Sequence, residues 1–337
     1  MKAAIISFTE KGNSIRKKIE DHLIVNEYEI MSSADGRAKE ISLNEWTNDY
    51  FTDSDFLVFV GACAIAVRSI APFLKSKKED PGVIVIDEMG QYVIPILSGH
   101  IGGANECAIM LAEFLGASSV ITTATDINNK FAVDVFAKKN SLEIEDMLKA
   151  KMISAKILDN MRIGLVSELT IEGKLPDEMV IAGNEEYGIY IGIKMMKPFK
   201  ETLNLIPKSV SVGIGCRKNT PKEKIENAVL ETLKENNIEL KSIKNLASID
   251  LKENEKGILD FSSEYNIDFV TYSSEELNSI KGSFSESEFV DKITGVSCVC
   301  ERAAVLGSSL GEVLIWKTIK DGVTVAVAQE NRRVKFE

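Results

Sequence analysis

The chain has 337 residues, of which 45% are hydrophobic and 27% charged, and its formal net charge is −11. This balance is typical of globular proteins, and the acidic surplus excludes general nucleic-acid binders, because no basic excess can displace phosphate counterions. The five cysteines are scattered and odd in number, which argues against a disulfide framework and favours a reducing, cytoplasmic location.

Short apolar runs alternate with helical patterns in the N-terminal part. No run approaches the roughly 18–20 residues of a membrane span, and the N-terminus lacks the hydrophobic region of a signal peptide. The runs are continuously apolar, so we expect a sheet covered on both faces. "VIVIDEMGQYVIPIL" predicts a hairpin, with Pro95 at an edge or a bulge because proline cannot donate to a ladder. Strands are expected near 3–8, 56–60, 83–86, 93–97 and 120–123, and helices near 14–23 and 62–70.

The stretch after residue 130 carries no evident motif. Helical patterns at "KFAVDVFAKKN" and "EIEDMLKAKMISAKILDN" precede short strands at 163–167 and 187–193. This stretch is typical of a packing or lid subdomain, and "KPFKETLNLIPKS" is interpreted as a linker. The terminal "ENRRVKFE" is interpreted as a frayed tail.

A second α/β unit is expected from the strand at 210–214 onward. The helix after it should begin with Thr220 as N-cap and Glu223 completing a capping box, and "IKDGV" near the end predicts a hairpin turn. One face of that helix is expected to be buried: Ile225, Ala228, Val229, Thr232 and Leu233. The predicted fold class is α/β, with an N-terminal Rossmann-like mixed sheet (1–129), a small α/β middle subdomain (130–207) and a separate α/β C-terminal domain (208–337).

The segment "SGHIGGAN" places one of only two histidines on a glycine-rich turn before a helix. Bare backbone at Gly99, Gly102 and Gly103 would let an anion approach unpaired amides at the helix N-terminus. His100 would stand beside that anion as a proton-transfer group. The alternative is that His100 is a capping or core residue of an ordinary turn.

"GIGCRKNT" repeats this design in the C-terminal unit. Gly213 and Gly215 precede the turn, and Arg217 flanks the expected anion site. Lys218 stands where a dinucleotide fingerprint would have its third glycine, and the chain contains no P-loop motif. Cys216 is either a nucleophile or a small apolar filler.

"VSCVCERAAVLGSS" holds a Cys-x-Cys pair followed by Glu301 and Arg302. Two cysteines supply too few ligands for a zinc site, so Cys298 and Cys300 are expected to be structural. Glu301 and Arg302 are either an exposed pair of little weight or, if they face a cleft, a base and a carboxylate-binding group.

Two further positions leave alternatives open. Asp126 in "ITTATDINN" is the expected N-cap of a helix, and Thr123 would line the crevice at the end of the preceding strand. Arg68 is the only charge in an apolar helix, so it is either paired internally or reaches a site.

These motifs together resemble the cobalt-precorrin-5A hydrolase (CbiG) family of cobalamin biosynthesis. The resemblance lies in the run from "VFVGACAIAVRSIAPF" to "VITTATD", and in "GIGCRKNTP", "SIDLKENEKG" and "GVSCVCERAAVLGS", covering residues 50–130 and 208–330. Asn219 departs from the glycine of many members, but asparagine tolerates the positive φ of such a turn.

The resemblance implies a hydrolase that opens the δ-lactone of a ring-contracted cobalt corrinoid and releases acetaldehyde. It implies no cofactor, because cobalt arrives in the substrate, and no metal ligands from the protein. His100 would activate water while an amide of Gly102 or Gly103 holds the oxyanion, with Glu301 as the alternative base. The expected catalytic residues are His100 and Glu301, and the expected substrate-binding residues are Arg68, Gly99, Gly102, Gly103, Asn105, Thr123, Asp126, Gly213, Gly215, Cys216, Arg217 and Arg302.

The expected partner is a cobalt-corrinoid small molecule, with neighbouring cobalamin-pathway enzymes and a homodimer also compatible with the sequence. No nucleic acid and no membrane are expected. The rival interpretation is a non-catalytic corrinoid carrier, in which both glycine-rich turns bind carboxylates and His100 only donates a hydrogen bond. A nucleotide-dependent synthetase is disfavoured because its phosphate loop is missing.

Overall fold

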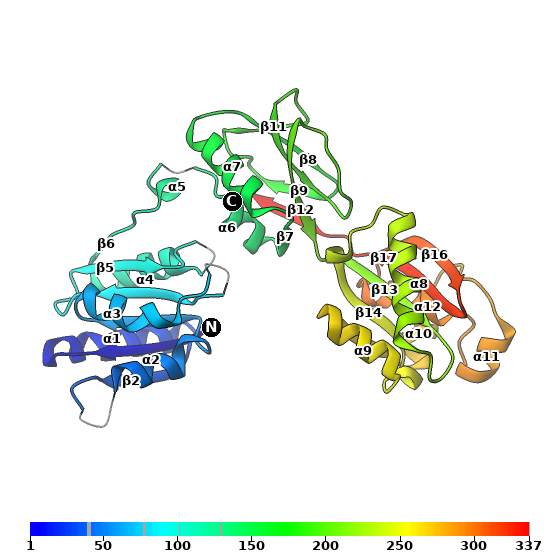
Figure 1. The fold of residues 1–337 in the computed structure, drawn as a ribbon, viewed down its shortest axis with the longest axis horizontal. Helices are drawn as coiled ribbons and strands as arrows, with labels where there is room; N and C mark the ends of the chain where they lie inside the picture. Colours follow the sequence, from blue (N-terminus) through cyan, green and yellow to red (C-terminus); the bar gives the residue numbers. More distant parts are fainter. Residues whose placement is uncertain (39–41, 77–78, 101, 129, 337) are drawn as a thin grey trace. The chain divides into compact units, whose positions relative to one another are not determined.

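The structure is a computed structural model that describes residues 1–38, 42–76, 79–100, 102–128 and 130–336 (Figure 1). The chain divides into two compact units, Met1–Val135 and Phe136–Glu337. The first unit contains β1 (Lys2–Ser7), α1 (Glu10–Val25), β2 (Glu29–Asp35), α2 (Leu43–Phe51), β3 (Phe56–Val60), α3 (Cys63–Ile70), η1 (Ala71–Phe73), β4 (Gly82–Ile86), β5 (Tyr92–Leu97), α4 (Ala104–Leu115), β6 (Ser118–Ser119), α5 (Ala124–Ile127) and the start of α6 (Val133–Lys139).

The second unit contains two five-stranded sheets and a two-stranded one. Its elements are β7 (Leu142–Ile144), α7 (Met147–Leu158), β8 (Ile163–Ser167), β9 (Thr170–Gly173), β10 (Met179–Ile181), β11 (Tyr187–Ile191), β12 (Glu201–Pro207), β13 (Val210–Gly215), α8 (Lys222–Glu235), η2 (Leu240–Ser242), β14 (Ile243–Ile249), η3 (Asp250–Lys252), α9 (Lys256–Tyr265), β15 (Asp268–Tyr272), α10 (Ser274–Ser279), α11 (Glu288–Thr294), α12 (Val299–Gly307), β16 (Glu312–Lys320), β17 (Val323–Gln329) and β18 (Arg333–Phe336).

The sheet of the first unit is mixed, as the sequence predicts. Its order is β2-β1-β3-β4-β5-β6, with β1 to β4 parallel and β5 antiparallel to β4. Its central strands are buried on both faces, because α1 and α4 cover one face and α2 and α3 the other. The predicted hairpin is confirmed, and Pro95 pairs with Ile84 at a register shift.

Three features of this unit were not predicted correctly. The edge strand β2 and the helix α2 were missed, since neither shows a continuous apolar run. The strand expected at 120–123 is wrong, because β6 ends at Ser119 after pairing only with Tyr92 and Val93. Pro95, two residues further along β5, offers no amide for a longer ladder.

The linker expected near residues 197–209 is also wrong. Most of it is β12, a strand of the sheet ordered β10-β8-β11-β12-β7. Leu203 and Leu205 are fully buried there, and β12 pairs with β11 in parallel and with β7 antiparallel. The apolar residues at alternate positions of β12 point to one face of the sheet, although charged residues flank the strand.

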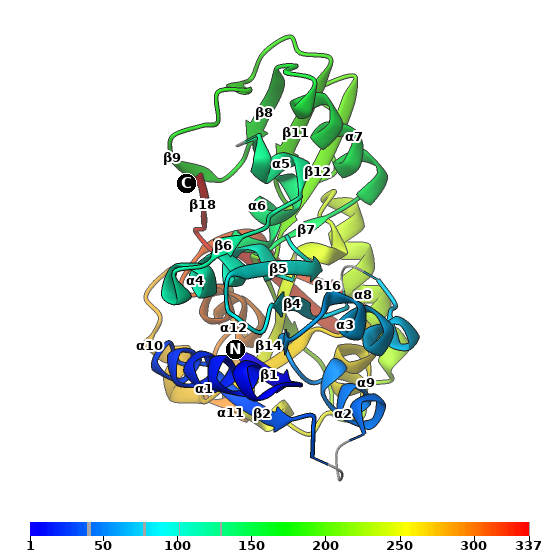
Figure 2. The ribbon, with the colours of Figure 1, turned by 90° about the vertical axis from the view of Figure 1, so that its left-hand side faces the viewer.

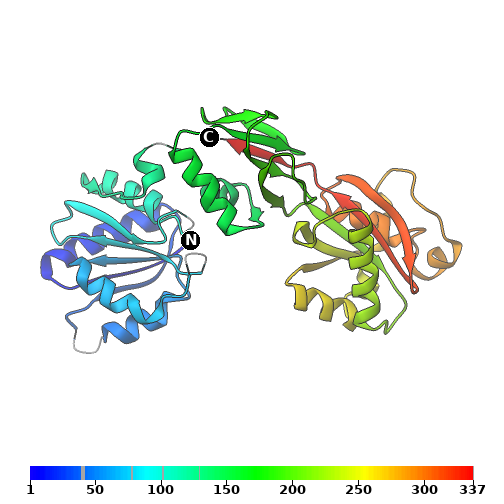
Figure 3. The ribbon, with the colours of Figure 1, turned by 45° about the horizontal axis from the view of Figure 1, so that its top comes forward.

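The C-terminal tail is an ordered strand and not a frayed end. β18 pairs in parallel with β9, as the red strand beside β9 shows in Figures 2 and 3. Phe336 is 4% exposed and stacks on Phe136 with ring centroids 4.4 Å apart. Asn140 Oδ1 accepts from Lys335 N at 2.8 Å. Aromatic burial and backbone pairing therefore hold the tail in place.

The remaining sheet has the order β15-β14-β13-β17-β16, with β13, β14 and β15 parallel. The helix α8 buries the five residues predicted for its inner face. The turn between β16 and β17 is the predicted hairpin, with Asp321 at φ 49° and Gly322 at φ 81°. No helix of the described ranges is long and apolar enough to cross a membrane.

The capping box predicted for α8 is wrong. The helix has Pro221 as its N-cap, without a side-chain capping bond. Thr220 Oγ1 instead donates to Arg217 O at 2.7 Å and closes the preceding turn. Asn219 adopts φ 62° in that turn, as the sequence predicts.

Candidate functional site

The histidine of the glycine-rich turn lies beside a carboxylate that no sequence motif predicts. His100 Nδ1 is 3.5 Å from Asp134 Oδ1, and each side chain is 14% exposed. His100 follows β5 and Asp134 lies in α6, so only the fold brings them together. A carboxylate beside Nδ1 orients the imidazole and favours the tautomer with its proton on Nδ1. The pair therefore has the arrangement of an oriented general base.

The amides of this turn are largely used by the turn itself. Gly103 N donates to His100 O, and Asn105 N donates to Gly99 O, both at 2.9 Å. The expectation that Gly103 offers its amide to an oxyanion is therefore wrong. Gly102 N donates to no acceptor in the described ranges, so it is the amide that can still serve an anion. Gly103 has another role, since it caps α4 at φ 78°, where a side chain would be strained.

Two expected ligand-binding residues hold each other. Asn105 is 6% exposed, and its Nδ2 donates to Thr123 Oγ1 at 3.0 Å. This bond ties the start of α4 to the segment before α5. The predicted cap at Asp126 is wrong, because α5 begins at Ala124; the side chain of Asp126 lies outside the described part of the chain.

The His100 turn lies at the amino-terminal edge of the parallel strands, because β5 runs antiparallel to β4. Ser98 Oγ donates to Asp80 O at 3.0 Å, just before β4 begins. The helix α3 returns the chain toward this edge, and Arg68 is exposed in its last turn. Arg68 has no hydrogen-bond or ion-pair partner in the described ranges, so the internally paired alternative is wrong.

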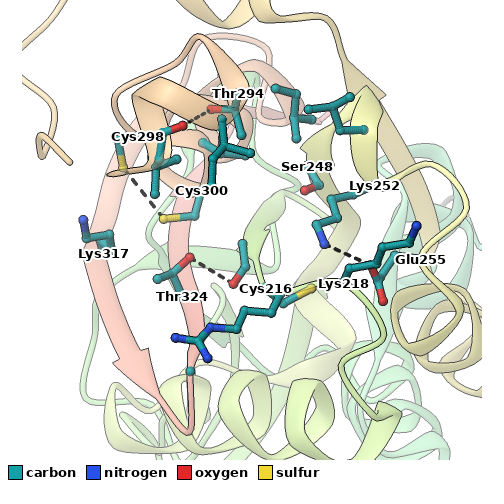
Figure 4. Close-up of a pocket in the computed structure, with 18 of the residues that line it drawn as sticks. Cys216, Lys218, Ser248, Lys252, Glu255, Thr294, Cys298, Cys300, Lys317 and Thr324 are labelled. Carbon is teal, nitrogen blue, oxygen red and sulfur yellow. Dashed lines mark hydrogen bonds and ion pairs between the residues drawn. The ribbon is translucent and has the colours of Figure 1, made fainter. Parts of the chain in front are cut away.

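A separate pocket of about 730 Å³ lies within the second unit (Figure 4). It opens at the carboxyl ends of β13 and β14, which is where ligands bind in open α/β sheets. Gly215, Cys216 and Arg217, all predicted from the sequence, line it. The volume is in the range of roughly 300–1,000 Å³ that holds small-molecule ligands.

The pocket carries more positive than negative charge. Arg217, Lys218 and Lys317 line it, and none has an ion-pair partner in the described ranges. Lys252 also lines it but pairs with Glu255, their Nζ and Oε2 atoms being 2.9 Å apart. Unpaired cations around a hollow favour an anionic ligand.

Sulfur atoms form part of the pocket wall. Cys298 and Cys300 line it with their Sγ atoms 3.9 Å apart, and Figure 4 shows both side chains on the wall that holds Thr324 and Lys317. The hydrogen bond between the two thiols lowers the pKa of Cys298 below its ordinary value of 9.0. The same bond, with burial, raises the pKa of Cys300 well above 9.0.

Cys216 is not an activated nucleophile by its surroundings. Burial raises the pKa of its thiol above 9.0, although Lys252 acts in the opposite direction. The described residues contain no group of three or more His, Cys, Asp or Glu that could hold a metal ion. The three thiols thus form part of the pocket wall.

Two expected site residues, Gly213 and Arg302, do not line the pocket, and their contacts serve the packing of α12. A Cβ on Gly213 would lie 1.8 Å from Cys300 O, so glycine here lets α12 approach β13. Arg302 Nη1 donates to Leu277 O and Ile280 O, each at 3.0 Å, and its guanidinium lies over Phe284. Backbone carbonyls thus hold Nη1 of Arg302, while its Nε is buried without a hydrogen-bond partner in the described ranges; the carboxylate-binding role of Arg302 stays a prediction.

Glu301 is fully buried, and both of its carboxylate oxygens are occupied. It accepts from Ser285 N and Oγ at 2.7 Å and from Lys317 N at 2.9 Å. Burial alone would raise the pKa of Glu301, but these bonds outweigh it and hold the pKa below 4.5. Such a carboxylate ties α12 to β16 and to the loop before α11, and it is poorly placed as a general base.

We expect Glu301→Gln to destabilise the second unit by about 1–3 kcal/mol, because an amide NH2 group, which is a donor, replaces an accepting carboxylate oxygen and faces another donor. Because folding lowers the pKa of Glu301, its carboxylate stabilises the folded state at pH values above its ordinary pKa. This stabilisation is lost as pH falls through the lowered pKa of the folded state. Thermal melts from pH 3 to 7 should show this acid-side loss in the native chain and not in the variant. A variant of unchanged stability that has lost its activity would restore the base role.

Sequence patterns did not predict Asp134, Lys252, Glu255 and Lys317 as site residues. Only the segment "SIDLKENEKG" gave a signal, since it carried the family resemblance and contains two of these four. Asp134 lies 34 positions from His100, and no spacing rule connects such residues before the fold is known.

Two family profiles match the chain. The one described as "Cobalamin synthesis G N-terminal" matches residues 45–126, and "Cobalamin synthesis G C-terminus" matches residues 210–328. The first profile covers the His100 turn, and the second covers the pocket residues that lie on β13, β14, α12 and β17.

Similar curated proteins include the cobalt-precorrin-5A hydrolases of Salmonella typhimurium and Priestia megaterium. The first is 34% identical over 293 residues, which is 82% of each chain. The second is 34% identical over 291 residues, covering 81% of this chain and 78% of the relative. A crystal structure of a cobalamin biosynthesis protein G homolog from Sulfolobus solfataricus is 25% identical, covers 97% of this chain and 96% of its own, and has a TM-score of 0.42.

Proposed function

This chain belongs to the cobalamin synthesis G family, and on that premise we propose that it hydrolyses cobalt-precorrin-5A in cobalamin biosynthesis. Relatives with that activity in their names align with four fifths of its length. One structural observation carries the proposal further, namely the pocket lined by Arg217, Lys218 and Lys317, for which the described part of the chain offers no ion-pair partner. A corrinoid bearing acetate and propionate side chains is the polyanion that such a pocket suits.

The first chemical step is the opening of the substrate's δ-lactone. His100, oriented by Asp134, takes a proton from water as it attacks the lactone carbonyl. Gly102 N stabilises the oxyanion of the tetrahedral intermediate. His100 then returns the proton to the leaving alkoxide, so that the products are a free hydroxyl group and a carboxylic acid, which loses its proton to solvent.

The second step breaks a carbon–carbon bond. His100 takes the proton of the new hydroxyl group, a C=O bond forms, and acetaldehyde leaves. The electron pair of the broken bond passes into the conjugated macrocycle, so the step uses the substrate's own electron sink. We therefore propose that no cofactor is required, with cobalt present as part of the substrate.

The test is an assay of the purified protein alone with cobalt-precorrin-5A. We expect acetaldehyde release together with the matching loss of mass from the corrinoid. Binding without release in the absence of other pathway enzymes would contradict hydrolysis and would support the carrier alternative. No observation on this chain or its relatives favours that alternative.

The positively charged residues of the pocket give a second prediction. We expect the double variant Arg217→Ala/Lys218→Ala to raise KM about tenfold with little change in kcat, because it removes binding shared by substrate and transition state. The effect should shrink at high ionic strength, since these groups are exposed. Lys234→Ala is the control, an exposed lysine of α8 outside the pocket. An unchanged KM in the double variant would place the substrate elsewhere.

A further inference from the structure

Two exposed aliphatic side chains lie at the mouth of the pocket in the second unit. Leu251 of η3 is 66% exposed, Ile293 of α11 is 62% exposed, and both line the pocket. Single exposed apolar residues are ordinary on protein surfaces. Here, however, two segments that are distant along the chain bring such side chains to the same hollow. This convergence indicates a shared role in binding a ligand.

The two side chains continue an apolar lining that begins inside the pocket. Ile249, the last residue of β14, is 2% exposed and lines the pocket two positions before Leu251. Val290 also lines the pocket, and it lies three positions before Ile293 on the same face of α11. The lining therefore reaches from the interior to the mouth on two elements. We call these four residues the apolar wall.

The segment that carries Ile293 is tied to the rest of the unit on both sides. Before α11, Ser285 N and Oγ donate to the buried carboxylate of Glu301, each at 2.7 Å. After α11, Asn278 Nδ2 donates to Gly295 O, also at 2.7 Å. Because both ends are held, α11 presents its apolar side to the pocket before any ligand arrives. Contact with a ligand then costs little conformational entropy.

The unpaired charges of the pocket come from other elements. Arg217 and Lys218 lie in the turn after β13, and Lys317 lies in β16. Figure 4 shows Thr294 of α11 on the side of the hollow opposite Lys218. The pocket thus offers an apolar wall and a separate set of cations. A ligand that matches both has an apolar body with carboxylates at its periphery.

We propose that Leu251 and Ile293 form the apolar half of the corrinoid site and contact the methyl-bearing rim of the macrocycle. This inference rests on the proposed function, because it takes the pocket to be the corrinoid site. A corrinoid has methyl groups and a conjugated ring between its carboxylate arms, so it matches both sets of residues. Binding removes the two aliphatic side chains from water, which favours association. The site therefore selects macrocyclic polyanions over simple carboxylates.

A matched pair of probes separates the two contributions. Dicyanocobyrinic acid carries free carboxylates, and its heptamethyl ester has the same macrocycle without their negative charge. Cyanide occupies both axial positions of cobalt in each probe, so the protein contacts only the ring and its arms. We expect the full chain to bind both probes. The acid should bind more tightly, with an affinity that falls as the salt concentration rises.

We expect Leu251→Ser and Ile293→Ser each to weaken binding of both probes about tenfold, because each removes an apolar contact that the probes share. Leu251→Met and Ile293→Val should keep most of the native affinity. Leu148→Ser and Ile181→Ser are the matched controls, since both are exposed apolar residues of the second unit outside the pocket. All these side chains are largely exposed, so the variants should remain folded.

The heat capacity of binding gives an independent readout. Burial of apolar surface makes the heat-capacity change on binding negative. Calorimetry at several temperatures should show a smaller change in Leu251→Ser and Ile293→Ser than in the native chain. The double variant Arg217→Ala/Lys218→Ala should keep the native heat-capacity change and should lose affinity for the acid alone.

The possible outcomes separate the two levels of inference. Unchanged affinity for both probes in Leu251→Ser and Ile293→Ser would overturn the apolar half of the site and leave the cationic half, with the proposed function, intact. Binding of the acid without any binding of the ester would do the same. Unchanged affinities together with the loss of a dimer in sedimentation would assign the two side chains to a protein interface and also overturn the proposal. Failure of the native chain to bind either probe would overturn the pocket as the corrinoid site.

Discussion

Replacing His100 with alanine is expected to lower kcat for acetaldehyde release by about 10²–10⁴-fold, which is the usual contribution of a general base. The reason is the side chain's position 3.5 Å from Asp134, where one nitrogen is oriented by a carboxylate. The measurement is single-turnover release of acetaldehyde from cobalt-precorrin-5A. KM should change little, because the loss concerns the transition state.

His22→Ala is the matched control, since His22 is the other histidine and stacks on Phe114 at the surface of the first unit. It should leave kcat unchanged. Asp134→Asn should lower kcat less than His100→Ala and should alter the pH profile of kcat/KM, because in the proposed mechanism Asp134 acts only by positioning the imidazole. Full activity of His100→Ala would end its assignment as the base.

Gly213→Val is expected to destabilise the second unit by about 4 kcal/mol or more, at the upper end of single-substitution effects. A Cβ at this position would lie 1.8 Å from Cys300 O, which is backbone and cannot turn away. The helix α12 would have to move off β13, and with it the pocket wall that holds Cys298 and Cys300. Urea unfolding, followed by hydrogen exchange of the β13 and α12 amides, measures the change.

Gly322→Ala provides the comparison for that prediction. Its Cβ would meet nothing within 4 Å, but the residue has φ 81°. Its cost is therefore backbone strain alone, about 1 kcal/mol. Similar losses in the two variants would contradict the close approach of α12 to β13 as the reason for glycine at 213.

The errors of the sequence analysis share a physical cause. Charged residues flank the alternating apolar residues of β12, so the sequence pattern did not predict a strand. Only the pairing of β12 with β11 and β7 in the structure shows it to be one. The tail at 333–336 looks polar, yet it is held because Phe136 and β9 lie beside it. In each case the stabilising contacts are made with residues distant along the chain, and a local hydrophobic pattern contains no information about them.

The sequence by itself determined the α/β class, the hairpins at 82–97 and 312–329, the buried face of α8 and the family, because periodicity, turn residues and motifs are local properties. The tertiary structure alone decided which groups surround each expected site residue. It paired His100 with Asp134, turned the Gly103 amide inward, buried Glu301 under three hydrogen bonds and gathered Arg217, Lys317 and Cys298 around one hollow. Side-chain chemistry depends on neighbours within a few ångströms, and the fold chooses those neighbours from distant parts of the chain.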